Sequence, residues 1–206
     1  MNFDIKKLKN SKELALLLGM FAGDGCLSIS HNGDGYRIYP IRFFNINKKY
    51  VELFDSLFFK VFDKKGTITG RKRANKKILW EFRLYSVELY KFINVELEIA
   101  NGKKALSVRI PSFIRLGNNA LKQHFFLGLL ITDGGIRTRG DIIFHSASKQ
   151  LINDLQKLIL DVWCFDRVVR DYIQKDRFKS YQLTLNKGES SLVLLNLPRW
   201  HNLVLR

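Results

Sequence analysis

The chain has 206 residues, with 35 lysines and arginines against 19 aspartates and glutamates, which gives a formal net charge of +16. This balance excludes an ordinary acidic or near-neutral enzyme, and a hydrophobic content of 46% excludes a disordered basic tail. A folded chain this basic points to a polyanionic partner, with nucleic acid first and an anionic membrane surface second.

No segment of the sequence predicts a membrane span or an export signal. The longest apolar stretches, Leu14 to Ala22 and Phe125 to Ile131, are far shorter than the roughly 18 to 20 residues that a span needs. The N-terminal residues lack an apolar run followed by a small-residue cleavage site. We therefore expect an intracellular location, either the cytoplasm of a prokaryote or an organelle matrix, and no membrane partner.

The first predicted element is an apolar helix that begins after Ser11 and ends at Asp24. Ser11 is a favourable N-cap residue because its hydroxyl can accept from a free N–H of the first turn. Ala15, Gly19 and Gly23 recur every four residues along this helix. Such a stripe of small side chains predicts close contact with a second helix.

Two strands, an amphipathic helix, two more strands and a short helix are predicted to follow the apolar helix. Apolar residues at three- and four-residue spacing indicate the amphipathic helix, and alternation indicates the strands. The predicted strands are Cys26–Ser30, Tyr36–Phe44, Thr67–Arg71 and Leu79–Tyr85, and the predicted helices are Lys48–Phe62 and Val87–Glu98.

The same series of elements recurs in the second half of the chain, which indicates an internal duplication. Asp24 and Asp133 end matching apolar motifs 109 residues apart, whereas Trp80–Tyr85 matches Tyr181–Asn186 at an offset of 101. The second copy is therefore eight residues shorter after its motif, which a shorter hairpin explains. Its predicted strands are Gly135–Arg139, Ile142–His145, Val168–Ile173 and Tyr181–Asn186, and its predicted helices are Lys149–Trp163 and Glu189–Leu197.

These elements predict an α+β fold of two tandem α-β-β-α-β-β-α repeats related by a pseudo-twofold axis. The first repeat is expected at residues 1–100, a linker at 101–119 and the second repeat at 120–206. We expect the two motif helices to pack at the centre. Two antiparallel four-stranded sheets with polar outer faces would form a saddle for DNA, whose major groove admits a β-ribbon.

The two motif helices would bring Asp24 and Asp133 together if they pack in parallel. A carboxylate at a helix C-terminus faces the negative end of the helix dipole, and two carboxylates also repel each other. A divalent cation removes both costs. Hard oxygen ligands favour Mg²⁺ over Zn²⁺, and Mg²⁺ beside a phosphodiester can activate a water molecule and stabilise the leaving oxygen.

The pair of motifs, each followed by two strand pairs, resembles the LAGLIDADG homing endonuclease family in its single-chain form. The resemblance spans about Ser11 to Leu197, although Ala22 and Ile131 replace the first acidic residue of the family motif. It implies an intron-encoded, monomeric enzyme that cuts both strands of a long asymmetric DNA site. The resemblance further implies Mg²⁺ held by Asp24 and Asp133, with Mn²⁺ as a substitute and Ca²⁺ supporting binding without cleavage.

The resemblance also implies a lysine and a water-ordering amide near the two aspartates. The candidates for these catalytic roles are Asn45, Asn47, Gln182 and Lys187, and Gly23 and Thr132 are expected to complete the metal site. Basic and polar residues of the outer strand faces and hairpin tips are the expected DNA contacts. They are Ser28, Ser30, Arg37, Arg42, Arg71, Lys72, Arg73, Lys76, Lys77, Arg83, Arg137, Arg139, Arg170, Lys175, Arg177, Lys179 and Thr184.

Two other functions fit the same pattern. A maturase would use the basic surface to bind intron RNA, and a regulator of the same fold would bind DNA without cutting it. Both aspartates are present, which favours the nuclease, because binding through a basic surface does not require them.

Overall fold

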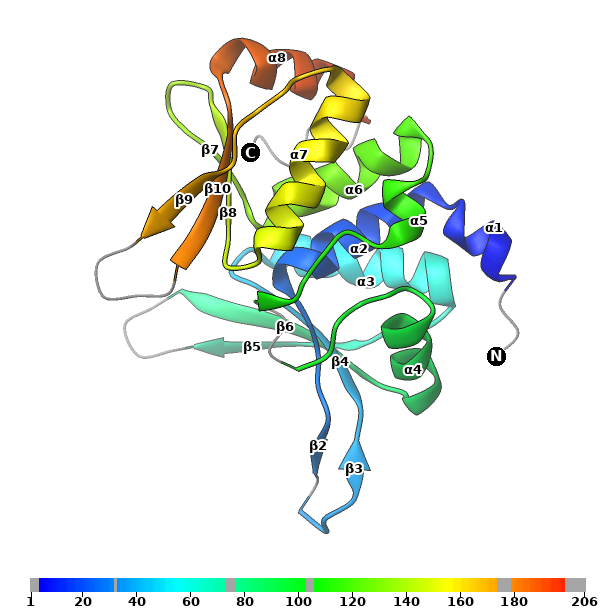
Figure 1. The fold of residues 1–206 in the computed structure, drawn as a ribbon. Helices are drawn as coiled ribbons and strands as arrows, with labels where there is room; N and C mark the ends of the chain where they lie inside the picture. The colour runs from blue at the N-terminus through cyan, green and yellow to red at the C-terminus, as the bar shows by residue number, and fades with distance from the viewer. Residues whose placement is uncertain (1–3, 32, 73–76, 103–105, 174–178, 199–206) are drawn as a thin grey trace.

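The computed structural model describes residues 4–31, 33–72, 77–102, 106–173 and 179–198, which form two repeats of one α/β unit (Figure 1). The first half contains α1 (Ile5–Lys9), α2 (Lys12–Asp24), β1 (Gly25–Leu27), β2 (Ser30–His31), β3 (Arg37–Ile38), β4 (Pro40–Asn45), α3 (Lys48–Phe62), β5 (Thr67–Lys72), β6 (Ile78–Tyr85) and α4 (Val87–Val95). The second half contains α5 (Ser112–Arg115), α6 (Asn119–Thr132), β7 (Gly134–Ile136), β8 (Ile142–Ser146), α7 (Lys149–Trp163), β9 (Arg170–Ile173), β10 (Lys179–Leu185) and α8 (Lys187–Asn196).

The motif helices α2 and α6 start at side-chain caps and are buried on nearly every side. The hydroxyl of Ser11 accepts from the N–H of Leu14 at 3.2 Å, which confirms the predicted N-cap of α2. The side chain of Asn118 caps α6 in the same way by accepting from Leu121. Helices that are apolar all round belong in a core, and these two form its centre.

The helices α2 and α6 approach each other closely and in parallel. A Cβ atom added to Gly19 would lie 2.1 Å from the carbonyl oxygen of Phe125, and one added to Gly128 would lie 2.2 Å from the carbonyl oxygen of Leu16. One turn further along, Gly23 faces Thr132. The small-residue stripe therefore predicted this contact correctly, because only glycine leaves room for backbone against backbone.

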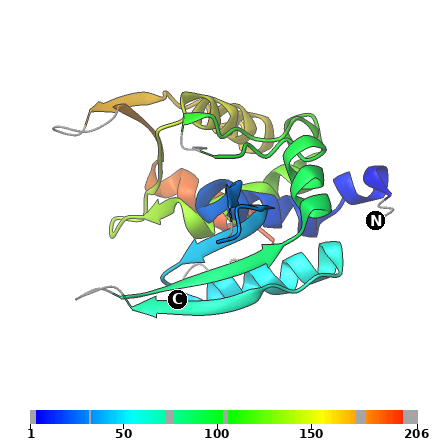
Figure 2. The same cartoon turned by 90° about the horizontal axis from the view of Figure 1, so that it is seen from below.

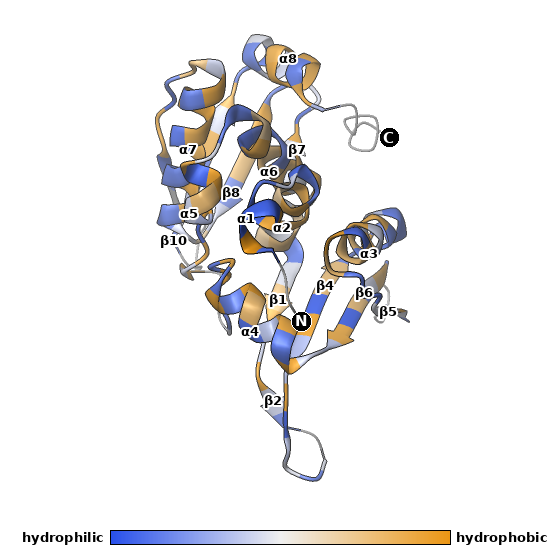
Figure 3. Cartoon of the chain, turned by 90° about the vertical axis from the view of Figure 1, so that its right-hand side faces the viewer, coloured by the Kyte–Doolittle hydropathy of each residue, from blue (hydrophilic) through white to orange (hydrophobic). Residues whose placement is uncertain are grey.

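Each repeat forms a four-stranded antiparallel sheet, as predicted. The strand orders are β1-β4-β6-β5 and β7-β8-β10-β9, so the second repeat copies the topology of the first. Hydrophobic and hydrophilic residues are interspersed along β4 and β6 (Figure 3). Figure 2 shows α3 and α7 against their own sheets, with α2 and α6 between the two halves.

Aromatic rings fill the space between the first sheet and α3. Phe43 of β4 stacks on Phe54 of α3 with ring centroids 4.3 Å apart, and Phe82 of β6 meets the same ring edge-on at 5.1 Å. All three side chains are fully buried. This packing fixes the register of β4 and β6, because a slip of one residue would turn Phe43 and Phe82 to the outer face.

The first hairpin differs from its prediction, since its two long strands are each interrupted. β1 pairs with β4, whereas β2 and β3 form a separate two-stranded ribbon that projects from the body (Figure 1). Pro40 lies at the break and has no N–H to donate to a ladder. We call the projecting segment, residues 28–39, the ribbon.

Smaller differences occur at element ends. The short helices α1 and α5 were not predicted, α4 ends at Val95, and α8 starts at Lys187. The strand predicted from Gly135 to Arg139 stops at Ile136, because the N–H of Arg137 already bonds to the carbonyl of Asp141 across the turn. Among the described residues, no helix combines the length and apolar character of a membrane span.

Candidate active site and nucleic-acid interface

The two motif aspartates lie at the C-terminal ends of the paired helices. Asp24 is the last residue of α2, and Asp133 is the C-cap residue of α6. A Cβ atom added to Gly23 would lie 3.2 Å from the carboxyl carbon of Asp133, so the two helix ends converge. The structure thus places the two carboxylates at one centre, between the sheets.

A divalent cation fits this centre. Each carboxylate lies at the negative end of a helix dipole, at a cost of about 0.3 to 1 kcal/mol without a counter-charge. Within the described ranges, no group of three or more histidine, cysteine, aspartate or glutamate residues could hold a metal ion. Two carboxylates with backbone oxygens form a hard donor set, which suits Mg²⁺, Mn²⁺ or Ca²⁺ and leaves coordination positions for phosphate and water.

The two residues that precede the aspartates, Gly23 and Thr132, were predicted to complete the metal site. Gly23 has no side chain, so it can offer only its carbonyl oxygen, and the single proton of the Thr132 hydroxyl is shared within its own helix between the carbonyls of Gly128 and Leu129, at 3.2 Å each. The predicted metal roles of Gly23 and Thr132 stay predictions.

Asn45, at the end of β4, is the amide that contacts Asp24. Its Nδ2 donates to Oδ2 of Asp24 at 2.7 Å, and its Oδ1 accepts from the N–H of Asn47 at 2.8 Å. Asn47 itself is the N-cap of α3, where its side chain accepts from the N–H of Lys49. Asn47 thus caps α3, and Asn45 is the one of the two asparagines whose amide reaches Asp24.

If the chain is the nuclease that the sequence predicts, replacing Asn45 with alanine should slow cleavage of one DNA strand about 10- to 100-fold, because residues that orient a metal-binding carboxylate have effects of this size. Strand-specific nicking, followed with a different label on each strand, measures this. Asn47→Ser keeps the cap of α3 and should leave both rates unchanged. A larger loss from Asn47→Ser than from Asn45→Ala would refute the assignment.

The register of the second sheet separates the other two catalytic candidates. Gln182 is opposite His145, one position along β8 from Phe144, which pairs with Gly134 next to Asp133. Lys187 follows the far end of β10, five residues beyond Gln182 or about 16 Å along a strand. Gln182 lies level with Asp133 in the sheet. Lys187 does not lie beside Asp133, which contradicts its predicted role there, because β10 runs away from Asp133 between Gln182 and Lys187.

In the first repeat, a buried glutamate holds one of the predicted DNA-binding arginines. Arg83 donates from Nε and Nη2 to the two carboxylate oxygens of Glu81, at 2.8 and 2.7 Å, and from Nη1 to the hydroxyl of Tyr85. Glu81 is only 3% exposed although it lies on the outer face. The bonds to Glu81 raise the pKa of Arg83. Arg83 therefore stabilises this face, and its guanidinium group is already hydrogen-bonded within the protein.

The second repeat has a neutral pair at the same position, which supplies a matched test. Gln182 donates to the hydroxyl of Thr184 at 2.8 Å, 101 residues after Glu81 and Arg83. Arg83→Thr should lower the free energy of unfolding by about 2 kcal/mol, because it strands a buried carboxylate. The double variant Glu81→Gln/Arg83→Thr should recover most of this loss in urea denaturation. Unchanged stability of the single variant would contradict a structural role for Arg83.

The other basic candidates of the first repeat surround this pair. Arg42 is directly opposite Arg83 and contacts the hydroxyl of Ser28 at 3.4 Å. Arg71 lies on the same outer face of the sheet as Arg83. Lys72 and Lys77 are exposed near the tip of the β5–β6 hairpin. Ser30 and Arg37 lie in the ribbon. The candidates Arg73, Lys76, Lys175 and Arg177 lie outside the described residues.

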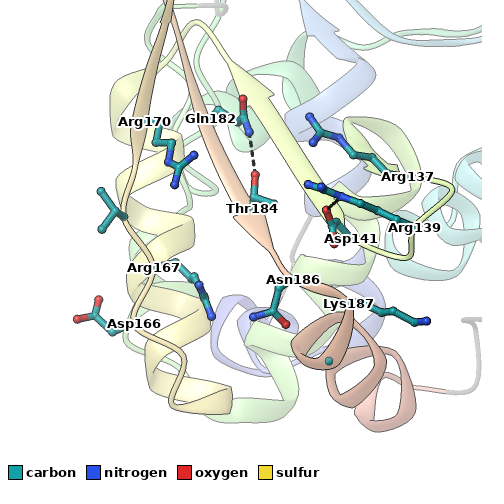
Figure 4. Close-up of a pocket in the computed structure, with 12 residues that line it drawn as sticks. Arg137, Arg139, Asp141, Asp166, Arg167, Arg170, Gln182, Thr184, Asn186 and Lys187 are labelled. Atoms are coloured by element: carbon teal, nitrogen blue, oxygen red, sulfur yellow. Dashed lines mark hydrogen bonds and ion pairs between the residues drawn. The ribbon is translucent and has the colours of Figure 1, made fainter.

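In the second repeat, a hollow of about 780 Å³ lies on the outer face of the sheet (Figure 4). Five basic side chains line it from three sides: Arg137, Arg139, Arg167, Arg170 and Lys187. Arg139 is paired with the buried Asp141, and Arg167 is paired with Glu189. Arg137 and Arg170 are exposed, at opposite sides of the Gln182–Thr184 pair (Figure 4). This hollow can receive phosphates or base edges of a nucleic acid.

Two further residues of the second repeat, Lys179 and His145, bear on the predicted DNA contacts. Lys179 pairs with Asp171 at 2.6 Å and lies over the ring of Tyr181, whose strand parity is that of the buried Leu183. Its strand position is on the side of β10 that packs on α7, but its side chain is exposed, and its predicted DNA contact stays a prediction. His145 was missed, although strand alternation places it outward. Burial lowers the pKa of His145, and the nearby Arg137 lowers it further.

Comparison with known proteins relates the second repeat to a described family. Residues 120–196 match the family described as LAGLIDADG-like domain. The second repeat is therefore similar to a LAGLIDADG-like domain. The match begins at α6 and ends with α8, so it contains the motif helix, the second sheet and Asp133. The resemblance drawn from the two motifs is thereby confirmed. No curated protein matches the chain.

Solved structures with the LAGLIDADG fold cover both repeats. The crystal structure of I-DmoI in complex with DNA and Mn has a TM-score of 0.67 at 17% identity, over 94% of this chain and 97% of that chain. Full-length DUF199/WhiA from Thermatoga maritima has a TM-score of 0.59 at 16% identity, over 97% of this chain and 62% of that chain. The N-terminal LAGLIDADG domain of DUF199/WhiA has a TM-score of 0.58 at 14% identity, over 100% of this chain and 92% of that chain.

Proposed function

We propose that the protein is a site-specific DNA endonuclease of the homing type, which hydrolyses one phosphodiester in each strand of a long asymmetric duplex. The observation that carries this proposal is the convergence of Asp24 and Asp133 at the ends of α2 and α6, between two sheets with basic outer faces. A metal centre at the middle of a symmetric DNA-binding surface can reach both strands.

The residues of the chain have separate tasks in this proposal. Asp24 and Asp133 would hold a divalent metal, which would supply an activated water and stabilise charge on the phosphate and the leaving oxygen. Asn45 fixes the orientation of the Asp24 carboxylate through its 2.7 Å hydrogen bond. Arg137 and Arg170 neutralise phosphates or contact bases on the second half of the site. Because binding neutralises phosphates, affinity should fall steeply with salt.

The structural comparisons support divalent metal and DNA as partners. I-DmoI was crystallised with DNA and Mn, and also with DNA and Ca. We propose Mg²⁺ as the metal for cleavage, Mn²⁺ as a substitute, and Ca²⁺ as an ion that supports binding alone. The internal repeat supplies both halves of the site, so we propose that the protein acts as a monomer, encoded within an intron.

A DNA-binding regulator is the second candidate, because the basic surface could bind DNA without cutting it, and the fold is also that of DUF199/WhiA. It would use the same saddle, but it would have no need of two carboxylates at the helix ends. A maturase that binds intron RNA would likewise not require them. The presence of both Asp24 and Asp133 favours the nuclease over either alternative.

Selection from a random duplex library separates the nuclease from the regulator. The protein is incubated with the library in Mg²⁺, and the ends of cleaved molecules are sequenced, with an EDTA control. We expect one preferred site of about 15 to 25 base pairs to be cut on both strands, and EDTA to stop the reaction. Duplexes that are bound and never cut would favour the regulator.

A further inference from the structure

The ribbon, residues 28–39, has no counterpart in the second repeat. In the first hairpin, the last pair of the main sheet, Leu27 with Ile41, encloses 13 residues. In the second hairpin the equivalent pair, Ile136 with Ile142, encloses five. The first hairpin is thus eight residues longer, and four of its residues form β2 and β3, where Ser30 pairs with Ile38 and His31 with Arg37.

The two hairpins leave the centre of the molecule in opposite directions. Each starts directly after a motif aspartate, and Figure 1 shows the ribbon at one end of the molecule and the β7–β8 turn at the other. In Figure 3 the ribbon again projects beyond the sheet that carries it. A duplex centred on Asp24 and Asp133 and contacted by both sheets extends in these same two directions.

The ribbon has the shape and the side chains of an element that enters a DNA groove. A two-stranded antiparallel ribbon fits the major groove. Its paired residues His31 and Arg37 are both exposed, and Tyr36 is 72% exposed. Arginine contacts guanine or phosphate, and histidine and tyrosine side chains can form hydrogen bonds with base edges or phosphate.

We infer that the ribbon binds duplex DNA beyond the reach of the second hairpin, so that the target has one longer arm, on the side of the first repeat. The inference rests on the proposed DNA binding, and it does not depend on cleavage. The eight extra residues lengthen each side of the first hairpin by four residues, or about 13 Å at 3.3 Å per residue. At about 3.4 Å per base pair, the longer arm has about four additional base pairs.

Hydroxyl-radical footprinting on a duplex selected in Ca²⁺ from a random library tests this inference. We expect the protected region to extend about four base pairs further from its centre on one side than on the other. Replacing residues 29–38 with Asn-Gly, a two-residue hairpin turn, removes eight residues and keeps Ser28 and Tyr39. This shortened protein should lose the extra protection at that end and keep the other end unchanged.

A full-length variant covers the case in which the shortened chain does not fold. Arg37→Ala should weaken protection at the longer arm, whereas Arg137→Ala should weaken it on the opposite arm. Each should also lower the salt dependence of binding by about one ion if its arginine contacts phosphate. Equal arms, or an unchanged footprint in the ribbon variants, would overturn the inference while leaving DNA binding intact. Failure to select any duplex would overturn the proposed function as well.

Discussion

Replacing Asp24 or Asp133 with asparagine is expected to abolish double-strand cleavage. Asparagine keeps the shape of the side chain and removes the charge that holds the cation between the helix ends. A metal ion supplies several kcal/mol of transition-state stabilisation, and a loss of about 4 kcal/mol corresponds to a roughly thousand-fold slower reaction. Single-turnover cleavage of a selected duplex in Mg²⁺ measures the effect.

DNA binding in Ca²⁺ separates this loss of chemistry from a loss of affinity. Both variants should bind the duplex within about a factor of ten of the original protein, because the aspartates contribute negative charge and the sheets supply the affinity. Arg137→Ala is the complementary control, since it should weaken binding and leave the metal centre intact. Unchanged cutting by either aspartate variant would refute the metal assignment.

Replacing Gly128 with alanine should destabilise the fold by about 3 kcal/mol, because the added methyl group would lie 2.2 Å from the carbonyl oxygen of Leu16. In an unobstructed helix the same change adds about 1 kcal/mol of stability, so the sign of the effect is diagnostic. For a chain of this size the melting temperature should fall by about 6 to 12 °C. Gly19→Ala should behave in the same way, since its methyl group would meet the backbone of Phe125.

Gly33 provides the matched control for this substitution. A Cβ atom there meets nothing within 4 Å, and the backbone of Gly33 does not have a positive φ. Gly33→Ala should leave the melting temperature unchanged within a degree or two, as is usual for surface substitutions. An increase in melting temperature for Gly128→Ala would show that α2 and α6 do not pack backbone to backbone.

The sequence predicted the large elements well where local signals are strong. Helices α3 and α7 have the predicted bounds, Lys48–Phe62 and Lys149–Trp163, because their apolar spacing is regular and each begins after a capping side chain. The glycine stripe predicted the helix contact, since Gly19 and Gly128 have no other local reason to interrupt apolar helices. The duplication then supplied the topology of the whole chain.

The finer assignments failed where tertiary hydrogen bonds decide. Asn45 and Asn47 are equal candidates in the sequence, and only the folded chain shows that Asn45 reaches Asp24 while Asn47 caps α3. Lys187 follows the end of β10, but the strand register shows that this end is the one distant from Asp133. The sequence predicts Arg83 to be a free cation on an outer face, whereas in the structure it is paired with the buried Glu81.

The most direct test of the central claim is to locate the metal. Crystals of the protein with a selected duplex and Mn²⁺ should show an anomalous scattering peak between the carboxylates of Asp24 and Asp133, next to a phosphate of the duplex. The peak should disappear in the Asp24→Asn/Asp133→Asn variant bound to the same DNA. Cleavage by the original protein with Mn²⁺ located only elsewhere, or with no Mn²⁺ between these aspartates, would contradict the account.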